Sequence, residues 1–404
     1  MRIIISSSTY APAMNGQAVF TTNLAEGLAK IGHQVMVIID SRHGKASTTY
    51  ENEVQIAELS SISLEKFRSG VNFAPFPKNE IRQLFDTFRP DLVHIQDHYP
   101  SCRSVANIAQ EYGIKIVGSN HYVPENLAPY IPLYSFLEPV FNWFLWQWML
   151  NLYKRLDVVT AQSTAAAKIL RRVGLKMPII PISCGIDTHQ YSPNPDVDRE
   201  SVCHNYGLDP NKFIFLFLGR IDGEKRIDLL LHAMQKLDRN DIQLAIAGHG
   251  SVEKRMKRLA EKMKLQDRVI FTGFIATENK PGLLNSVDVF VMPSEAELLS
   301  ISTLEAMACS RPVLVADALA LPELVRQGEN GYLFTPGDAD DLTKRMIELA
   351  DQSQRWKEMG VISRDIAAQH DLEKIIRKYE GLYTKMMSEA PVTKVNEKLE
   401  EIAQ

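Results

Sequence analysis

The chain has 404 residues, of which 45% are hydrophobic and 23% are charged, and its formal net charge is -4. This length is too great for one ordinary hydrophobic core and suits two domains, and the composition excludes wholesale disorder. The small negative net charge excludes a protein built to coat nucleic acid, so any attraction to phosphate groups has to be local.

The cysteines and the N-terminus predict a cytoplasmic protein. The four cysteines are Cys102, Cys184, Cys203 and Cys309. They form no CxxC pair and have no histidine at metal-ligand spacing, which predicts reduced thiols and not a disulfide framework or a zinc site. The apolar run at residues 3–5 is too short for a signal peptide.

Short apolar segments alternate with helical segments through the first half of the chain. The expected strands are residues 3–5, 35–39, 92–95, 114–117 and 158–161. Amphipathic stretches, such as residues 20–30 and 79–88, lie between them. Strand, helix and strand in repetition predict right-handed crossovers and a parallel sheet with helices on both faces.

The second half repeats this alternation. The expected helix is residues 227–237, and the expected strands are residues 213–218, 243–247, 269–271, 287–291 and 313–316. The predicted fold class is therefore α/β, with two Rossmann-like, doubly wound parallel-sheet domains that face each other across a cleft.

Composition also predicts where the domains begin and end. The expected parts are a first domain over residues 1–187, a polar linker with prolines over 188–212, a second domain over 213–368, a helical segment over 369–388 that returns to the first domain, and a polar tail over 389–404. A dinucleotide-binding loop is a weak alternative for the second domain. The nearest match to G-x-G-x-x-G is Gly248-His249-Gly250, and Glu253 stands at the third glycine position.

The most informative stretch, residues 293–309, follows an expected strand and opens a helix. Glu297 lies in the loop and Glu305 in the first turns of the helix, with seven residues between them. One carboxylate can accept a hydrogen bond from a sugar hydroxyl and the other can accept two from a ribose diol, while N–H groups at the helix start suit an anion. A capping box at Ser302-x-x-Glu305 is the alternative for Glu305.

The Glu-x7-Glu pattern, followed by Ala-Met-Ala-Cys at residues 306–309, resembles the signature of family 4 retaining glycosyltransferases of the GT-B fold. Residues 10–16, 32–35, 185–187 and 217–226 resemble other segments of that family, in the expected order along almost the whole chain. The resemblance implies a hexosyltransferase that uses a nucleoside-diphosphate sugar. The first domain would be the acceptor side and the second would bind the nucleotide sugar.

The resemblance also implies the roles of the catalytic candidates. Arg220 and Lys225 would bind the donor diphosphate, Glu297 would bind the sugar, and His121 would contact the sugar near its reacting carbon. Fixed cations at the diphosphate stabilise the negative charge that develops as it departs. The alternatives are solvated basic residues in a loop and a structural histidine at a strand end.

The remaining donor-binding candidates follow from the same resemblance. Gly16 would let the backbone approach the phosphates, or would simply form a turn. The other expected donor contacts are Phe274, Ile275, Leu298, Leu299, Ser300 and Glu305. Residues 298–300 stand where the family often has Gly-Phe-Gly, so the loop is expected to contact the sugar differently.

No cofactor and no metal are expected. No Asp-x-Asp pair stands where a divalent cation would bridge the diphosphate, and the acidic run at residues 338–341 fits a helix N-terminus. The resemblance implies retention of the anomeric configuration, with the departing phosphate accepting the proton of the acceptor. UDP-glucose is the expected donor, and UDP-galactose, UDP-N-acetylglucosamine and GDP-mannose are left open.

An aromatic segment over residues 130–153 holds three of the four tryptophans, Trp143, Trp146 and Trp148. Apolar residues occupy nearly all faces of the helix expected here, so the helix is either buried or lies at a lipid interface. Residues 121–127 resemble the acceptor-side loop of diacylglycerol glucosyltransferases in the same family. The residues expected on the acceptor or membrane side are His121, Tyr122, Glu125, Asn126, Trp143, Trp146, Lys168, Arg171 and Arg172.

The leading hypothesis is therefore a cytoplasmic enzyme, peripheral on the inner face of the membrane, that glycosylates a lipid such as diacylglycerol. Basic residues of the segment 168–172 would meet anionic headgroups, or would belong to an ordinary solvated face. The alternative functions are transfer to a soluble sugar or phenol, a sugar-nucleotide 2-epimerase, and a nucleotide-binding protein without catalytic activity.

Overall fold

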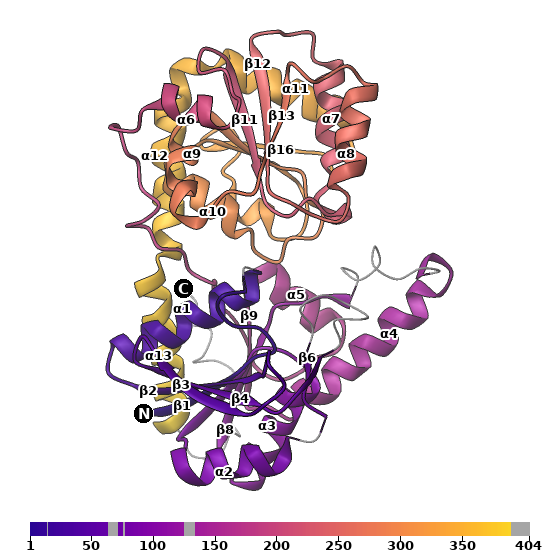
Figure 1. Cartoon of the computed structure of the whole chain (residues 1–404). Coiled ribbons are helices and arrows are strands. Elements are labelled where there is room, and N and C mark those ends of the chain that lie inside the picture. Colours follow the sequence, from indigo (N-terminus) through magenta and orange to yellow (C-terminus); the bar gives the residue numbers. More distant parts are fainter. Residues whose placement is uncertain (14, 64–71, 76, 125–133, 389–404) are drawn as a thin grey trace. The chain divides into compact units, whose positions relative to one another are not determined.

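The structure is a computed structural model that describes residues 1–13, 15–63, 72–75, 77–124 and 134–388. The chain forms two compact units (Figure 1): unit 1 consists of Met1–Gly185 and the segment that begins at Leu372, and unit 2 consists of Ile186–Asp371. Both units are α/β with mainly parallel sheets, so the expected α/β class with two parallel-sheet domains is confirmed.

Unit 1 is built on an eight-stranded sheet with the order β10-β9-β8-β7-β1-β2-β4-β3. The strands are β1 (Arg2–Ser6), β2 (Gln34–Asp40), β3 (Ser47–Glu51), β4 (Val54–Leu59), β7 (Leu92–Ile95), β8 (Lys115–Asn120), β9 (Val158–Ala161) and β10 (Ile179–Pro181). Neighbouring strands are parallel except for the antiparallel pair β3 and β4. The central strand β1 is apolar at successive positions because helices cover both faces of the sheet. The short strands β5 (Ile62–Ser63) and β6 (Asn72–Phe73) pair separately.

The helices of unit 1 are α1 (Gly16–Lys30), α2 (Lys78–Phe88), α3 (Pro100–Glu111), α4 (Tyr134–Tyr153), α5 (Thr164–Arg172) and α13 (Leu372–Ser388). The first and last of these lie side by side (Figure 1). A Cβ at Gly27 of α1 would lie 2.6 Å from Ile376 Cδ1 of α13, so any larger residue at this position would force the Ile376 side chain to move.

A buried polar network joins α13 to the sheet of unit 1. His94 on β7 is hydrogen-bonded through Nδ1 to the Tyr383 hydroxyl at 2.7 Å and through Nε2 to Ser119 Oγ at 2.8 Å. The Thr160 hydroxyl lies 3.3 Å from the Tyr379 hydroxyl. Burial lowers the pKa of His94 to about 3, so the ring is neutral at physiological pH and its role here is structural.

Unit 2 contains a six-stranded, wholly parallel sheet with the order β13-β12-β11-β14-β15-β16. The strands are β11 (Phe213–Leu218), β12 (Ile242–Ala247), β13 (Val269–Gly273), β14 (Val289–Met292), β15 (Val313–Ala316) and β16 (Gly331–Phe334). All six residues of β11 are buried, which explains its uninterrupted apolar sequence.

Helices cover both faces of this sheet (Figure 1). They are α6 (Arg199–Asn205), α7 (Ile227–Lys236), α8 (Glu253–Lys262), α9 (Lys280–Asn285), α10 (Ile301–Ala308), α11 (Ala339–Asp351) and α12 (Trp356–Ala367). Helix α6 lies within residues 188–212, the stretch expected as a linker, which is part of unit 2.

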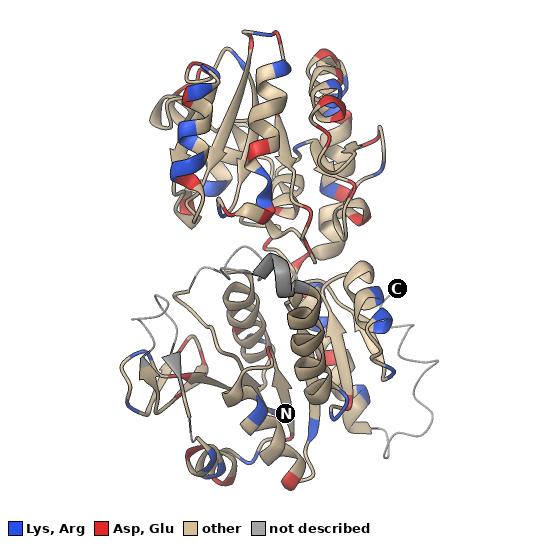
Figure 2. Ribbon diagram, turned by 90° about the vertical axis from the view of Figure 1, so that its right-hand side faces the viewer, with Lys and Arg blue, Asp and Glu red and all other residues tan. Residues whose placement is uncertain are grey.

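Figure 2 shows acidic and basic residues interspersed along the helices of unit 2. This mixture agrees with the small net charge of -4 for the whole chain. Within the described residues, none of the helices has both the length and the apolar character that crossing a membrane requires.

Candidate active site

Each sheet contains a switch point, where the strand order runs in opposite directions from two adjacent strands. This point lies between β11 and β14 in unit 2 and between β1 and β7 in unit 1. In doubly wound sheets, ligands bind outside the carboxyl ends of the strands at such a point. The segments that follow β11 and β14 contain the expected residues Arg220, Lys225 and Glu297, and the loop after β1 leads into α1, which begins at the expected residue Gly16.

The loop after β11 presents Arg220. Its side chain is 60% exposed, and its guanidinium forms ion pairs with Asp222 (Nη1–Oδ2 2.5 Å) and Glu224 (Nη2–Oε1 3.1 Å). Asp222 is buried and accepts hydrogen bonds from the backbone N–H and the hydroxyl of Ser251, at 2.8 and 2.7 Å. A fixed carboxylate thus orients a guanidinium, the side-chain group best suited to bind two phosphate oxygens at once.

Two ion pairs join the loop after β11 to the loop after β14. Lys225 Nζ pairs with Glu297 Oε1, and Arg226 Nη1 pairs with Glu295 Oε1. The side chains of Lys225 and Glu297 are only 16% and 11% exposed, so solvent screens their attraction weakly. The structure therefore brings two of the four catalytic candidates into direct contact.

The glycines after β12 allow its loop to lie against the loop that carries Arg220. Gly248 has a φ of +130°, and a Cβ built on it would lie 1.9 Å from the carbonyl oxygen of Gly219. A Cβ on Gly250 would lie 2.2 Å from the carbonyl oxygen of Ile221. This backbone contact accounts for both glycines without a dinucleotide.

Helix α10 begins after Ser300 and not after Ser302. Ser300 is the N-cap, and its hydroxyl accepts a hydrogen bond from the Thr303 N–H at 3.4 Å. Glu305 therefore lies in the second turn, and its interpretation as a capping residue is wrong. Glu305 is 6% exposed, and its Oε1 lies 3.6 Å from Lys280 Nζ.

The other residues expected at the donor differ in exposure. Leu298, Leu299 and Ser300 are all buried, so a donor would meet this loop mainly through backbone groups. After β13, Phe274 is 53% exposed and Ile275 is 3% exposed. Phe274 thus offers a ring face to a ligand, whereas Ile275 anchors the loop to the core.

In unit 1, Asp97 holds the loop after β1. Asp97 follows β7 and is 5% exposed, and its carboxylate accepts hydrogen bonds from the Ser8 N–H at 2.7 Å and from Gln17 Nε2 at 2.8 Å. Gly16 is exposed at the first position of α1. It belongs to this helix, whose N-cap is Asn15, so its interpretation as a turn with unusual dihedrals is wrong.

His121 follows β8, and both of its ring nitrogens are engaged within unit 1. Its Nε2 lies 2.9 Å from Gln96 Oε1, and its Nδ1 is paired with Gln162 Nε2. The ring of Phe20 packs against the imidazole, with 4.9 Å between centroids. Burial lowers the pKa of His121 to about 4, so the ring is neutral at physiological pH. This geometry favours positioning of a ligand over proton transfer.

Comparison with protein families identifies this arrangement. Residues 198–364 match the family described as Glycosyl transferases group 1, and residues 14–190 match Glycosyltransferase Family 4. The two matches together extend over most of the chain and include the loops after β11, β12 and β14. The chain belongs to the family 4 glycosyltransferases. The expected family and the GT-B fold are thereby confirmed.

Two relatives illustrate the similarity in sequence. The alpha-monoglucosyldiacylglycerol synthase of Streptococcus pneumoniae is 25% identical over 339 residues, which cover 83% of this chain and 75% of that protein. The sulfoquinovosyl transferase of Arabidopsis thaliana is 28% identical over 292 residues, which cover 70% of this chain. The match covers 54% of that protein, so the chain spans about half of its length.

Solved structures establish the shared fold. Sucrose-phosphate synthase from Thermosynechococcus elongatus has a TM-score of 0.78 at 20% identity, and the match covers 96% of this chain and 99% of that one. HepE of Anabaena in complex with UDP-glucose has a TM-score of 0.74 at 18% identity, with 95% and 99% covered.

Helix α4 of this glycosyltransferase has an exposed aromatic face, which consists of Val140, Trp143, Phe144 and Trp148. These residues are 67%, 62%, 57% and 42% exposed. Their spacing places them on one side of a helix, whereas Trp146 points to the other side and is 6% exposed. The alternative of a wholly buried helix is therefore wrong.

The other residues expected on the acceptor or membrane side also lie in unit 1. Lys168, Arg171 and Arg172 are exposed on α5, and Arg171 also donates to the Ile179 carbonyl at 3.2 Å. Tyr122 is half-buried next to His121, and its N–H donates to Asn120 Oδ1 at 2.8 Å. Glu125 and Asn126 lie outside the described residues.

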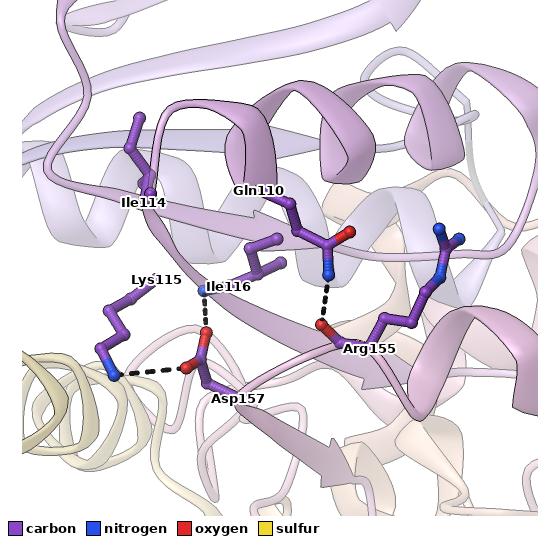
Figure 3. A pocket seen from close by; sticks show the side chains of 7 residues that line it. Gln110, Ile114, Lys115, Ile116, Arg155 and Asp157 are labelled. Carbon is purple, nitrogen blue, oxygen red and sulfur yellow. Dashed lines mark hydrogen bonds and ion pairs between the residues drawn. The ribbon is translucent and has the colours of Figure 1, made fainter. Parts of the chain in front are cut away.

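A shallow pocket lies at the amino-terminal edge of the unit 1 sheet, where β8 begins (Figure 3). In this pocket, Asp157 pairs with Lys115 Nζ at 3.3 Å and accepts a hydrogen bond from the Ile116 N–H at 2.8 Å. Gln110 donates to the Arg155 carbonyl at 2.7 Å. These groups satisfy one another, and they lie away from the carboxyl ends of the strands, so we assign the pocket no role in transfer. No cluster of His, Cys, Asp or Glu suited to a metal ion occurs in the described part of the chain.

Sequence reasoning missed several residues that the structure places beside the candidates. They are Gln96, Asp97, Gln162, Tyr191 and Lys280. The sequence could have indicated the first three, because each is a polar residue at the first or second position after a strand. His121 stands at the first position after a strand in the same way. No sequence pattern indicated Tyr191 and Lys280, because these residues come close to Glu305 only in the folded chain.

Proposed function

We propose that this enzyme transfers glucose from UDP-glucose, without a metal and with retention of the anomeric configuration, to a hydroxyl group of a membrane lipid such as diacylglycerol. The observation that carries the lipid acceptor is the exposed aromatic face of α4. A helix that lies in the membrane surface buries such a face, and Trp is favoured at that depth. Exposed Lys168, Arg171 and Arg172 in the same unit would attract anionic headgroups.

The loops after β11 and β14 support the donor side of the proposal. Cleavage of the bond between the sugar and the diphosphate leaves negative charge on the departing phosphate, which Arg220 and Lys225 would stabilise. Lys225 is paired with Glu297 in the structure. A bound diphosphate would draw the ammonium toward its oxygens, and Glu297 would then accept a hydrogen bond from a sugar hydroxyl.

The transfer step needs no further base from the protein. The acceptor hydroxyl attacks the anomeric carbon from the face that the diphosphate leaves, and the departing phosphate oxygen takes up the hydroxyl proton. Gln96 and Gln162 hold the neutral ring of His121 in place, and the ring would help to position the sugar. UDP-glucose as donor is supported by HepE, which was solved with that nucleotide sugar, and glucose as the transferred sugar is supported by the name of the streptococcal relative.

Release of nucleoside diphosphate tests the proposal. The full chain is incubated with a panel of nucleotide sugars, without added metal, with and without vesicles that contain diacylglycerol. Release from UDP-glucose that rises sharply with the vesicles is expected. Release that ignores the vesicles would place the acceptor among soluble sugars or phenols. Conversion of the nucleotide sugar without any acceptor would instead indicate an epimerase.

The aromatic face of α4 gives a prediction for membrane binding. The double variant Trp143→Ser/Phe144→Ser is expected to lower partition onto anionic vesicles by about tenfold or more. The reason is that it removes two large apolar side chains that would otherwise be buried in the membrane surface. Cosedimentation with phosphatidylglycerol vesicles measures the partition. Tyr50→Ser is the matched control, since Tyr50 is a 73% exposed aromatic residue on β3 of the same unit. Equal partition of the double variant and the control would contradict a membrane role for α4.

A further inference from the structure

Two polar side chains from separate segments of unit 2 meet at Glu305 of α10. Glu305 is 6% exposed, and its Oε1 lies 3.6 Å from Nζ of Lys280, the first residue of α9. The side chain of Tyr191, which precedes α6, interacts with the same carboxylate, and Tyr191 is 4% exposed. No function described so far uses Lys280 or Tyr191.

The surroundings of Glu305 oppose its ionisation in one respect and favour it in two. Burial raises its pKa, whereas the charge of Lys280 and the hydrogen bond from Tyr191 lower it. The Cys309 thiol also faces Glu305, and burial raises the pKa of that thiol to about 12, so it stays uncharged. Lys280 and Tyr191 are therefore the groups that oppose protonation of this carboxylate, whose pKa burial raises above its usual value.

The charge state of Glu305 decides what it can recognise. An ionised carboxylate accepts hydrogen bonds at both oxygens and can hold both hydroxyls of a ribose diol. A protonated carboxyl group donates one hydrogen bond and loses part of this acceptor capacity. A diol held by an ionised, buried group is bound more tightly than an analogue that lacks one hydroxyl, because the missing hydroxyl leaves a buried acceptor without a partner.

The two partners of Glu305 are held in place by the fold. Lys280 follows the loop after β13 that contains Phe274, through a single turn of 3-10 helix at Thr277–Asn279. The carbonyl of Tyr191 accepts a hydrogen bond from Arg364 Nη1 at 2.6 Å, and the same nitrogen donates to the Ala308 carbonyl at the end of α10, also at 2.6 Å. Arg364 thus fixes the backbone at Tyr191 relative to the helix that carries Glu305.

We propose that Lys280 and Tyr191 are positioning residues that keep Glu305 an acceptor for both ribose hydroxyls of the nucleoside diphosphate, and that they thereby make the enzyme discriminate ribonucleotides from 2′-deoxyribonucleotides. This inference rests on the proposed function, because it takes Glu305 as the group that binds the ribose.

Calorimetric binding of UDP and of 2′-deoxy-UDP to the full chain tests the inference. We expect the wild-type chain to bind UDP about tenfold or more tightly than 2′-deoxy-UDP, as for a charge-assisted hydrogen bond. Lys280→Met is expected to bring this ratio to within about twofold, mainly by weakening UDP, and Tyr191→Phe is expected to lower it in part. Lys280→Arg should restore most of the ratio, because it restores the positive charge.

The dependence of UDP affinity on pH gives a second readout, which would not change if Lys280 had only a structural role. Without Lys280 the pKa of Glu305 rises further, so UDP affinity should fall at a higher pH in Lys280→Met than in the wild type when the solution is acidified. Lys262→Met, at an exposed lysine at the end of α8, is the control and should change neither the ratio nor the pH profile. Matching unfolding midpoints for the variants exclude a loss of folding.

Two outcomes would overturn the inference alone. One is an unchanged ratio of UDP to 2′-deoxy-UDP affinity in Lys280→Met. The other is equal weakening of both nucleotides, which would show a general attraction of charge without a role at the ribose. If the wild-type chain bound none of UDP, GDP and ADP, the proposed function would fail and this inference with it. If it bound GDP or ADP in place of UDP, the same comparison is made with that nucleotide and its 2′-deoxy counterpart.

Discussion

Replacement of Lys225 by alanine is expected to lower kcat by roughly 10²- to 10³-fold, which corresponds to about 3–4 kcal/mol of lost transition-state stabilisation. The expected loss is large because the ammonium lies in a half-buried site between the loops after β11 and β14, where solvent screens it weakly. Negative charge on the diphosphate is greatest after the sugar has begun to leave, so the effect should appear in kcat and only secondarily in KM. Initial rates at saturating donor measure it.

The same substitution leaves Glu297 without its ion-pair partner, so a loss of stability has to be separated from a loss of catalysis. The double variant Lys225→Ala/Glu297→Gln removes the unpaired charge and should recover stability, as measured by the unfolding midpoint, without recovering kcat. Lys236→Ala is the matched control, since Lys236 lies on α7 of the same unit and pairs with Asp340 at the surface. A near-normal kcat in Lys225→Ala would contradict the role of Lys225 at the diphosphate.

Gly248→Ala is expected to be among the most destabilising single substitutions in unit 2, at about 4 kcal/mol or more. A Cβ at this position would lie 1.9 Å from the Gly219 carbonyl oxygen, and the φ of +130° is itself unfavourable for alanine. Neither backbone can withdraw easily, because both belong to loops that follow buried central strands. Urea denaturation of the full chain, followed by a signal from unit 2, measures the loss.

Gly328→Ala is the control that separates the cost of an unfavourable φ from the cost of a steric clash. Gly328 also has a positive φ, +76°, but no heavy atom lies within 4 Å of a Cβ built there. Its replacement should therefore cost only the backbone strain, about 1–2 kcal/mol. The carbonyl that Gly248→Ala displaces belongs to the residue before Arg220, so any folded variant should also bind the diphosphate more weakly. Similar stabilities for the two alanine variants would contradict the importance of the contact between loops.

The architecture was predictable where buried strands alternate with helices. The apolar run at 213–218 can only be a strand covered on both faces, and β11 occupies that range. The edge strand β3 (Ser47–Glu51) was missed, because it is polar and exposed at all five positions and carries no apolar pattern. Helix α6 was missed because its stretch is short and polar and contains flanking prolines.

The candidate site was predictable where chemistry is local in sequence. Arg220 and Lys225 lie in the loop after one strand and Glu297 in the loop after its neighbour, as the motifs suggested. Contacts that depend on topology were not predictable. The pairing of Lys225 with Glu297 requires β11 and β14 to be adjacent, and the sequence does not reveal strand order.

Other errors have simple physical reasons. Ser300 and Ser302 both fit an N-cap, and only the observed start of α10 decides between them. The helix α4 is apolar on nearly all sides, so periodicity could not separate the exposed Trp143 from the buried Trp146. Proximity of Gln96 and Gln162 to His121 depends on the order of β7, β8 and β9 in the sheet.

Transfer of labelled sugar into lipid tests the central claim most directly. The full chain is incubated with UDP-glucose labelled in the glucose, together with vesicles of phosphatidylglycerol and diacylglycerol, and the products are extracted into organic solvent. The account predicts label in the organic phase, in an α-linked glucolipid, since retention preserves the configuration of the donor. Label that stays in the aqueous phase while UDP is released, or a β-linked product, would contradict it.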